Sequence, residues 1–558
     1  MQLLPWLIAL LTLVVVILST PTLGRYLFDV FDDRPQPIWD RWLNPLEQQL
    51  LRWIGERGTR IDSALGYAGA LLISNVLFAG VGLLLLLKQP AWLNPLAWPG
   101  LRWDLALHTA ISFVAGADQQ HLVPEQSLGN LAQLGAIQFL MFVSAGTGVA
   151  VGFAFIRGLT GRPLGNYNRD LIRAHTRVLI PGSVLLAVAL VICGVPMTLS
   201  APVEITTLEG SRQLLVRGPI ALFEAIKQLG VNGGGFFMAN SSHPYENPNL
   251  LSNLICIWAM LIIPAATIDT FGRFAANRRQ SNLLLVLVFG LLSVTCVLAM
   301  SAEQAGNPLL SKWLDGVNLE GKDLRFGAQL SAFWTMLSTG TMTGSMNGSV
   351  ESSMPVTILL AIFNLLLQVL LGGPGIGFAN LIVFILLSVF LTGLMVGRTP
   401  EFLGRKVERS EVILASVVLL IHPIFVLIPT AFALISETVR STLSGEGSHA
   451  ISQVVYQFAS AASANGSTMG GITDFTPWWN VASSLSILGG RYLPILALLV
   501  LADGFRRKPA VAPSPGSLHT DTALFTGVVA VVVVILGVLT FFPVMALGPI
   551  AEALSFTS

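Results

Sequence analysis

The stretch Gly218-Pro-Ile-Ala-Leu-Phe-Glu-Ala-Ile-Lys-Gln-Leu-Gly230 continues directly into Val231-Asn-Gly-Gly-Gly-Phe-Phe-Met-Ala-Asn240. Pro219 stands where a first helical residue would, and Gly230 stands where a helix would stop. The helix between them would be about 18 Å long, too short for a bilayer core of about 30 Å. A short helix followed by glycines can present carbonyl oxygens to a cation, which the negative end of the helix dipole favours. An ordinary glycine-rich turn is the alternative interpretation of this stretch alone.

The composition indicates a membrane protein with several spans. Of the 558 residues, 53% are hydrophobic and only 11% are charged, whereas about 25% are charged in an average soluble domain. The mean hydropathy is +0.72. The formal net charge of +1 gives no argument for a nucleic-acid partner. All three cysteines, Cys193, Cys256 and Cys296, lie in apolar runs and are expected to be packed thiols.

Ten apolar runs are long enough to cross a bilayer. They lie near Leu3–Leu23, Ala64–Leu87, Leu131–Ile156, Arg177–Val195, Leu251–Phe271, Leu283–Met300, Phe378–Val396, Val412–Ile435, Ala482–Leu501 and Leu524–Val544. The first lacks a preceding basic segment and is interpreted as a retained span. Basic residues gather after the third, fifth, seventh and ninth runs, and the positive-inside rule makes these loops cytoplasmic. With the basic Arg25–Arg60 connection also inside, both termini are predicted to face outward.

The short helix and its glycine turn recur in every outer loop between paired spans. The other three helices are expected at Asp104–Val114, Phe326–Leu337 and His449–Phe458, followed by turns that contain Gly116, Gly344 and Gly466. Non-helical backbone at membrane depth is tolerated only where protein buries it or water lines it. Four such loops on one side can close around one axis. Four unrelated outer loops that happen to contain glycine are the alternative.

This pattern predicts an all-α polytopic membrane protein, with four pseudo-repeats of span, re-entrant helix, filter loop and span around a central pore. The predicted units are an N-terminal span with its connection at 1–60, pore repeats at 61–160, 161–275, 276–400 and 401–508, and a C-terminal span at 509–558.

The third unit contains an interrupted apolar run. The run from Met354 to Val396 is about twice the length of a single span, and Gly372-Gly-Pro-Gly-Ile-Gly377 interrupts it. We predict a helix that is broken within the membrane, because breaks at glycine and proline often line a pathway or a gate. A hairpin of two spans is the alternative, and it would place the basic Arg398–Arg409 loop outside.

These residues resemble the KdpA family, the potassium-binding, channel-like subunits of the bacterial Kdp potassium-transporting ATPases. The resemblance extends over nearly the whole chain and is carried by Gly165-Asn-Tyr167, Gly194-Val-Pro196, the segment from Gln228 to Pro248, Val396–Gly404, Asn465-Gly-Ser467 and Ala546–Pro549. It implies a potassium filter made by the four loops, at Ala115–Asp118, Val231–Gly234, Met342–Ser345 and Ala464–Ser467.

The resemblance also implies a multi-pass protein of the bacterial inner membrane that works in a complex. In that family the P-type ATPase subunit KdpB hydrolyses ATP, and the small subunits KdpC and KdpF assist. Ions pass the filter and leave sideways through a tunnel into the ATPase subunit. The interrupted helix near Gly372–Gly377 obstructs the straight route to the cytoplasm.

The chain departs from the family pattern at the site itself. The first loop usually reads Thr-Asn-Thr-Asn-Trp-Gln, but Ala115–Gln120 retains only the last Gln. The third loop usually reads Ser-Cys-Gly-Ala, where Met342–Ser345 reads Met-Thr-Gly-Ser, and Gln368 replaces a usual Glu. Gly116 would make all four central positions glycine. Asp118 is interpreted either as a solvated loop charge or as a group that raises the local cation concentration.

Backbone carbonyls replace the hydration shell of a potassium ion. Glycine fits such a loop, whereas a β-branched or bulky residue at positive φ does not. The candidate potassium-binding residues are Ala115, Gly116, Val231, Asn232, Gly233, Gly234, Thr343, Gly344, Asn465 and Gly466, and the candidate gate residues are Gln368, Gly372, Gly373, Gly375 and Gly377. Glu224 and Glu246 flank the second filter loop and either brace it or lie in the outer vestibule.

We expect no ATP site in this chain. An Asp-Lys-Thr-Gly phosphorylation motif is missing from the sequence, and the near match to a phosphate-binding loop at Gly316–Asp323 ends in Asp instead of Ser or Thr. The favoured function is the potassium-binding subunit of an ATP-driven uptake pump, with potassium as the transported ion. A stand-alone cation channel or an ion-coupled potassium transporter is the alternative, because both need the same filter.

Overall fold

The computed structural model describes residues 3–32, 34–35, 37–56, 61–310, 316–510 and 519–556. Within these ranges, ten helical segments are long and apolar enough to cross a membrane, which is the number that the sequence predicts. Seven are single helices: α1 (Leu4–Phe31), α3 (Ala64–Lys88), α10 (Leu250–Phe274), α11 (Arg278–Ala305), α14 (Ile376–Val396), α15 (Arg409–Ile435) and α18 (Pro477–Arg507). The prediction of an all-α polytopic membrane protein is confirmed.

The other three spans each contain a wider π-helical turn. They are α5–η2–α6 (Asn130–Ala132, Gln133–Gln138, Phe139–Leu159), α7–η3–α8 (Tyr167–Arg173, Ala174–Leu179, Ile180–Ile192) and α19–η5–α20 (Ala523–Met545, Ala546–Ile550, Ala551–Ser555). The fourth span therefore begins at Tyr167 instead of Arg177. Its first turns are polar, so hydropathy alone does not mark them.

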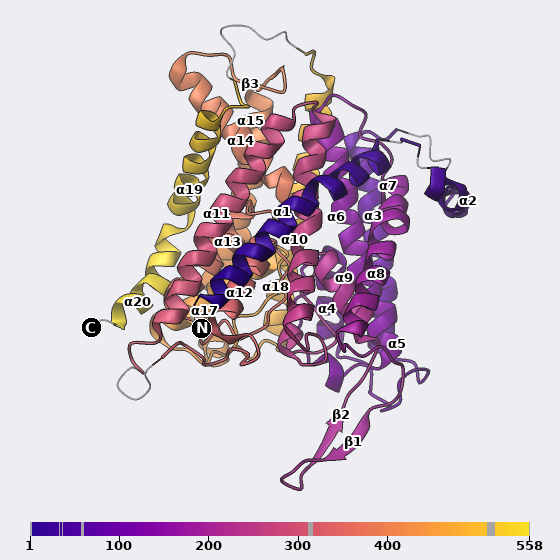
Figure 1. The fold of residues 1–558 in the computed structure, drawn as a ribbon, viewed down its shortest axis with the longest axis vertical. Helices are drawn as coiled ribbons and strands as arrows, with labels where there is room; N and C mark the ends of the chain where they lie inside the picture. Colours follow the sequence, from indigo (N-terminus) through magenta and orange to yellow (C-terminus); the bar gives the residue numbers. More distant parts are fainter. Residues whose placement is uncertain are drawn as a thin grey trace.

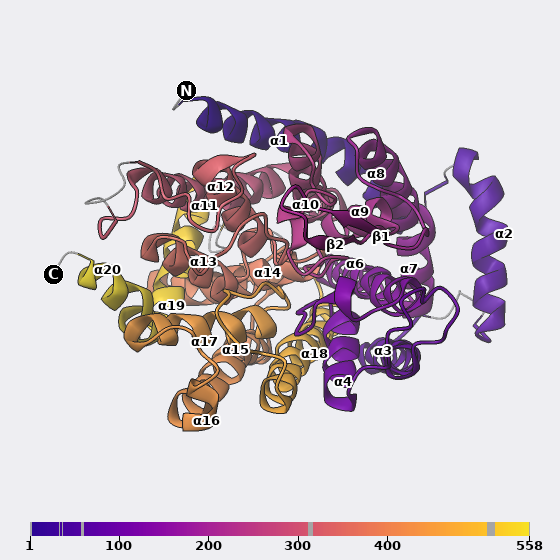
Figure 2. The ribbon, with the colours of Figure 1, turned by 90° about the horizontal axis from the view of Figure 1, so that it is seen from below.

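Four short helices lie between the paired spans. They are α4 (Trp103–Ala115), α9 (Ile220–Leu229), α12 (Gly327–Gly340) and α17 (Gly447–Ala462), each at a predicted place. Each packs against the spans that flank it, for example α9 against α8 and α10, and α12 against α11. All four lie toward one end of the molecule, the end that also holds both termini (Figure 1). In Figure 2 the four short helices follow one another in chain order around the middle of the molecule.

The third unit is a discontinuous crossing. Helix α13 (Pro355–Leu367) has 13 residues, too few for a span, and α14 resumes after a non-helical connector, Gln368–Gly375. Helix α13 lies toward the end with the short helices and α14 toward the opposite end, beside the hairpin β3–β4 (Glu401–Phe402, Arg405–Lys406) (Figure 1). The predicted break is present. The hairpin alternative is wrong, because the chain continues in one direction across the break.

The Arg25–Arg60 connection contains a helix that the sequence analysis missed. Helix α2 (Pro37–Trp53) brings Asp40 and Glu47 to Arg177 of η3, with distances of 2.7 and 2.6 Å between oxygen and nitrogen. The connection is therefore not a simple basic loop, since its acidic residues neutralise a buried arginine. The predicted unit boundary at residue 60 falls in 57–60, outside the described residues.

The remaining elements lie in the loops. An antiparallel hairpin, β1–β2 (Val203–Thr206, Arg212–Leu215), projects from the end that holds the short helices (Figure 1). The short turns η1 (Pro124–Gln126), η4 (Asn240–Ser242) and α16 (Glu437–Arg440) complete the fold. The spans with the largest buried share are those at the centre, Asn130–Leu159 and Leu250–Phe274. The ends of the four short helices are therefore buried at the centre of the bundle.

Candidate ion-filter site

The four short helices end in the same backbone motif. A backbone amide just beyond each helix donates to a carbonyl five residues back: Ala117 to Ser112 (3.0 Å), Asn232 to Lys227 (2.8 Å), Thr343 to Ser338 (2.9 Å) and Asn465 to Ser460 (2.9 Å). The residue before each donor is left-handed, with φ of +74° at Gly116, +56° at Val231, +58° at Met342 and +55° at Ala464. This combination is a Schellman cap. It makes Gly116 the counterpart of Val231, Met342 and Ala464.

The cap changes which residues of the four loops are equivalent. The residue after each cap donor is Asp118, Gly233, Gly344 or Gly466, and these four line one cavity of 230 Å³. A comparison by residue type alone pairs Gly116 with the three glycines. Counting from the left-handed cap residue of each loop instead shifts the first loop by two residues. Asp118, not Gly116, therefore stands at the level of the glycines.

One structural expectation about these loops is wrong. We expected that a β-branched residue would not occupy positive φ, yet Val231 has φ of +56°. Such a conformation persists only where the surroundings fix it. Here the cap hydrogen bond of Asn232 and the burial of Val231 fix the turn.

The loops meet through backbone atoms at the centre. A methyl group on Gly466 would lie 1.7 Å from the carbonyl oxygen of Ala117, and one on Gly344 would lie 1.8 Å from that of Asn465. On Gly233 it would lie 2.8 Å from the carbonyl oxygen of Thr343. These distances are far below van der Waals contact, so a side chain is excluded at all three positions. The carbonyl groups of neighbouring loops thus face the glycines.

Polar side chains tie each loop to the next. Gln120 Nε2 donates to Gly235 O (3.1 Å), Gln228 Nε2 to Ser345 Oγ (2.8 Å), Asn465 Nδ2 to Ser338 O (3.1 Å) and Gln119 Nε2 to Gln457 O (3.4 Å). These bonds join the first loop to the second, the second to the third, the third to the fourth and the fourth to the first. The four loops therefore form a closed ring.

The side chains of the supporting candidates are used within this scaffold. Asn232 Nδ2 donates to Met141 O of α6 (3.1 Å), and Thr343 Oγ1 bonds Thr341 Oγ1 (2.7 Å). The side-chain amide oxygens are engaged as acceptors, since Asn232 Oδ1 accepts from Ser144 Oγ (3.2 Å) and Asn465 Oδ1 accepts from Ser467 N (3.1 Å). Any ion contact from Asn232, Thr343 and Asn465 is left to their backbone carbonyls.

A buried charge cluster braces the second loop. Lys227 of α9 forms ion pairs with Glu224 (2.6 Å) and with Glu246, and all three side chains are at most 1% exposed. Lys227 Nζ also donates to Asn240 Oδ1 (2.8 Å), and Asn240 Nδ2 donates to Gly233 O (2.6 Å). The cluster thereby fixes a carbonyl of the loop itself. Of the two interpretations of Glu224 and Glu246, the bracing one fits, and Lys227 is the partner that the sequence analysis missed.

His243 directly follows Ser242, which lines the cavity. His243 stacks on Phe237 with ring centroids 3.6 Å apart. Burial, aided by the nearby Arg325, lowers the pKa of His243 to about 4, so its ring is neutral at pH 7. The positive charge next to this part of the lining is Arg325, which donates to Ser242 O (2.8 Å) and is paired with Asp323.

Asp118 differs from the solvated charge that the sequence suggested. Its side chain is buried, with the whole residue 1% exposed, and neither carboxylate oxygen has a hydrogen-bond partner within the described residues. The interpretation as a solvated loop charge is therefore wrong. Burial follows from the cap register, which puts Asp118 where the other loops have glycine.

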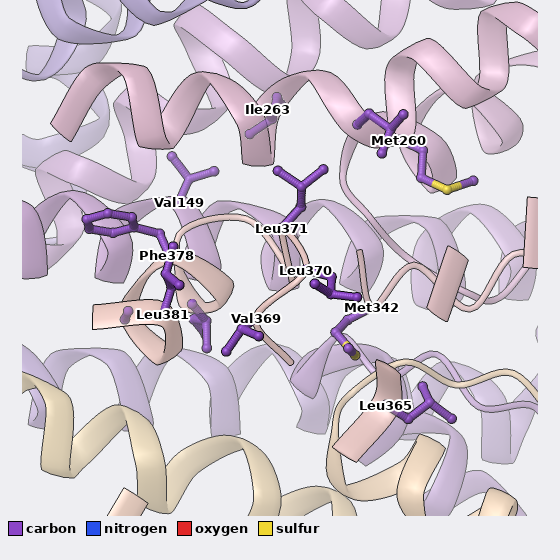
Figure 3. Packing of buried hydrophobic residues seen from close by; sticks show 14 of the residues in the cluster. Val149, Met260, Ile263, Met342, Leu365, Val369, Leu370, Leu371, Phe378 and Leu381 are labelled. Carbon is purple, nitrogen blue, oxygen red and sulfur yellow. The ribbon is translucent and has the colours of Figure 1, made fainter. Parts of the chain in front are cut away.

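The connector between α13 and α14 lies beneath the ring. Gly372 N donates to Gly340 O at the end of α12 (3.0 Å), and a methyl group on Gly375 would lie 2.5 Å from Gly148 O of α6. The connector thus crosses from the third unit to the first. Figure 3 shows its apolar side chains, Val369, Leu370 and Leu371, packed in the buried cluster that also contains Ile263, Met342 and Phe378.

The candidate gate residues belong to this crossing. Gln368 caps α13 in a left-handed conformation (φ +55°) and accepts a hydrogen bond from Asn380 Nδ2 (3.1 Å). Gly372, Gly373 and Gly375 lie in the connector, and Gly377 lies in the first turn of α14. A methyl group on Gly377 would lie 2.2 Å from Leu371 O, so the connector folds tightly against α14.

Sequence reasoning also missed Arg491 of α18. A methyl group added to Gly116 would lie 3.6 Å from the guanidinium of Arg491, and a methyl group added to Gly373 would lie 3.9 Å from it. Arg491 therefore sits between the first filter loop and the connector. The sequence does contain a signal for Arg491, because an arginine inside an apolar span indicates a functional position.

The fold and these loops define a multi-pass, all-α membrane protein with four short helices whose capped ends meet at one cavity. The family described as potassium-transporting ATPase A subunit matches residues 10–554. The chain is 51% identical over 552 residues to the potassium-transporting ATPase potassium-binding subunit of Anabaena sp. (strain L31), covering 98% of each chain. The chain therefore belongs to the family of potassium-transporting ATPase A subunits, which the sequence resemblance indicated.

Two further relatives carry the same description. The potassium-transporting ATPase potassium-binding subunit of Synechocystis sp. (strain ATCC 27184 / PCC 6803 / Kazusa) is 48% identical and covers 97% of this chain and 98% of its own length. That of Geobacillus kaustophilus (strain HTA426) is 40% identical and covers 98% of each chain. The similarity thus extends over the spans, the short helices and the connector alike.

Proposed function

We propose that this chain is the potassium-binding and potassium-translocating subunit of an ATP-driven potassium uptake complex. The observation that carries the proposal is the convergence of four identically capped helix ends on one cavity. Each helix presents the negative end of its dipole, equivalent to roughly half an elementary charge, to the same place. The names of the relatives agree with this function.

We assign ion selection to the backbone carbonyls of the four loops. The proposed ligands are the carbonyls around Gly233, Gly344 and Gly466, with Asn232, Thr343 and Asn465 beside them. Ala115, Gly116, Val231 and Gly234 hold the turns. Carbonyl groups replace the hydration shell of potassium, and the closed ring keeps them in place.

The proposed complex supplies the energy from another chain. This sequence has no phosphorylation motif, so ATP hydrolysis is assigned to a P-type ATPase subunit, KdpB, with KdpC and KdpF as accessory subunits. We place the chain in the bacterial inner membrane with both termini outside. The support is that the basic Arg398–Arg409 segment lies at the end opposite to both termini (Figure 1).

The connector is proposed as a gate that blocks the straight route from the filter to the cytoplasm. It crosses beneath the ring, and Arg491 adds a fixed positive charge beside it. Both features oppose the passage of a cation through the centre. Ions that have passed the filter would then leave sideways toward the ATPase subunit.

The gate proposal predicts a leak when the connector is displaced. A Gly377→Ala variant must move Leu371 O and Gly372, because its methyl group would lie 2.2 Å from the former and 2.3 Å from the Cα of the latter. We expect passive Rb⁺ flux through reconstituted complexes without ATP to rise several-fold. A Gly377→Ala complex that assembles normally and stays as tight as the wild type would contradict the gate.

The first experiment on the proposed function is cation-stimulated ATP hydrolysis by the complex purified through this chain. We expect K⁺ to stimulate hydrolysis more than Na⁺, with Rb⁺ close to K⁺, because the carbonyl ring selects by dehydration. Equal stimulation by all three ions would exclude strict potassium selection. Absence of a co-purified ATPase, together with cation currents through the chain alone, would favour the stand-alone channel or ion-coupled transporter.

A further inference from the structure

Asp118 is a buried carboxylate without a partner. The residue is 1% exposed, and neither Oδ1 nor Oδ2 accepts a hydrogen bond from any residue that the structure describes. The backbone amide of Gly233 in the second loop approaches the carboxylate without completing a hydrogen bond. An ionised carboxylate that is buried and uncompensated is strongly unfavourable. Burial accordingly raises the pKa of Asp118 well above its usual value, and a cation beside the carboxyl group would favour its ionised form.

The protein does not supply that charge by an ion pair. Arg491 is the cationic side chain that faces this region, but its guanidinium lies beside Gly116 and Gly373, on the connector side of the first loop. Among the described residues, neither carboxylate oxygen of Asp118 has a hydrogen-bond partner, and Arg491 acts on Asp118 only through its electrostatic field. Arg491 attracts Asp118 electrostatically without forming an ion pair with it, so both carboxylate oxygens remain available to a bound cation.

The position of Asp118 is that of a filter residue. The helix caps place it level with Gly233, Gly344 and Gly466, and it lines the same cavity as these glycines. Its own carbonyl oxygen would lie 3.0 Å from a methyl group on Gly234, so its backbone takes part in the ring. Three loops therefore offer only neutral groups at this level, and the first offers a formal negative charge.

We propose that Asp118 is a direct ligand of the cation at the outer level of the filter, and that this level also takes Ca²⁺ from the outside as a competitor of K⁺. The proposal rests on the proposed filter function and adds a side-chain ligand to it. One carboxylate with several carbonyl oxygens and water is a calcium ligand set. The attraction of a divalent ion to a fixed charge is twice that of a monovalent ion, so a charged level binds Ca²⁺ where a neutral carbonyl ring does not.

The test is a potassium titration of the purified complex at several Ca²⁺ concentrations, without ATP. The readout is the thermal unfolding midpoint, which rises when an ion binds the folded state. In the wild type we expect the K⁺ concentration that gives half of the maximal shift in the unfolding midpoint to increase with the Ca²⁺ concentration. The competition should become measurable at Ca²⁺ concentrations on the order of 10⁻³ M. In Asp118→Asn this K⁺ concentration should rise about tenfold without Ca²⁺ and no longer respond to Ca²⁺.

Two variants make the result specific. Asp118→Gly gives the first loop the glycine that the other three loops have, and its φ of +55° suits glycine, so this variant folds. It should lose calcium competition like Asp118→Asn. Asp323→Asn removes an outer carboxylate that is already paired with Arg325, and it should behave as the wild type.

Calcium competition that persists unchanged in both Asp118 variants would overturn the proposal. The outcome is separable from that of the proposed function, because binding is measured without ATP hydrolysis. Calcium competition that depends on Asp118 would support the ligand role even if K⁺ failed to stimulate hydrolysis. Stimulation by K⁺ with no effect of Asp118 would leave the pump and exclude the ligand.

Discussion

Replacing Gly344 by alanine is expected to abolish high-affinity potassium binding. Gly344 has φ of +78°, and the added methyl group would lie 1.8 Å from Asn465 O and 2.9 Å from the Cα of Gly233. A left-handed conformation costs a non-glycine residue roughly 1–2 kcal/mol, and the clash also displaces a carbonyl that we assign to the ion. We expect the K⁺ concentration for half-maximal ATP hydrolysis to rise by more than about tenfold. Discrimination against Na⁺ should decrease together with the affinity for K⁺.

The matched control is Gly290→Ala in α11. A methyl group there would have no atom within 4 Å, and the residue is helical, so the change should be neutral or slightly stabilising. Both substitutions add one methyl group to a glycine of the same chain. If Gly344→Ala kept the potassium dependence of Gly290→Ala, the carbonyl ring would not be the filter.

Replacing Lys227 by methionine is expected to destabilise the second filter loop. The ammonium group is fully buried between Glu224 and Glu246, and it holds Asn240, whose amide holds Gly233 O. Removing one member of a buried ion cluster leaves uncompensated charge and typically costs about 3–5 kcal/mol. We expect a lower unfolding midpoint of the purified protein and a higher K⁺ requirement, because the loop loses its brace.

Two further variants separate charge from packing in this cluster. Lys227→Met combined with Glu246→Gln removes one positive and one negative charge, so part of the lost stability should return. Arg212→Met breaks the exposed pair with Glu204 on the β1–β2 hairpin, and such pairs contribute about 0–1 kcal/mol. A Lys227→Met variant as stable as Arg212→Met would show that the buried cluster does not hold the loop.

The membrane topology was predictable because the bilayer imposes simple rules on sequence. Apolar runs such as Ala64–Leu87 identified α3 almost to the residue, and the ten spans followed from length and hydropathy. The break at Gly372–Gly377 was also visible, since glycine and proline interrupt a helix wherever they cluster. Helix α2 is not visible as an apolar run, because it is polar on the side that meets Arg177.

The candidate site was predictable only in part. The three loops with Gly233, Gly344 and Gly466 were predictable, because a close contact between two backbone segments requires glycine and glycine is visible in the sequence. The first loop was misaligned, since Gly116 is a glycine for a different reason: it takes the left-handed position of the helix cap. The same conformation is taken in the other three loops by residues that are not glycine, namely Val231, Met342 and Ala464. Residue type therefore does not identify the cap position.

The sequence by itself determined the number of spans, the four short helices and the interruption of the third unit. Hydropathy and helix-stop signals act locally, and each of these features is a local property of the chain. Only the tertiary structure decided that Asp118 stands level with three glycines, that Lys227 joins Glu224 to Glu246, and that Arg491 lies between the first loop and the connector. These relations join residues distant in the chain, and they depend on how the helix ends are packed against one another.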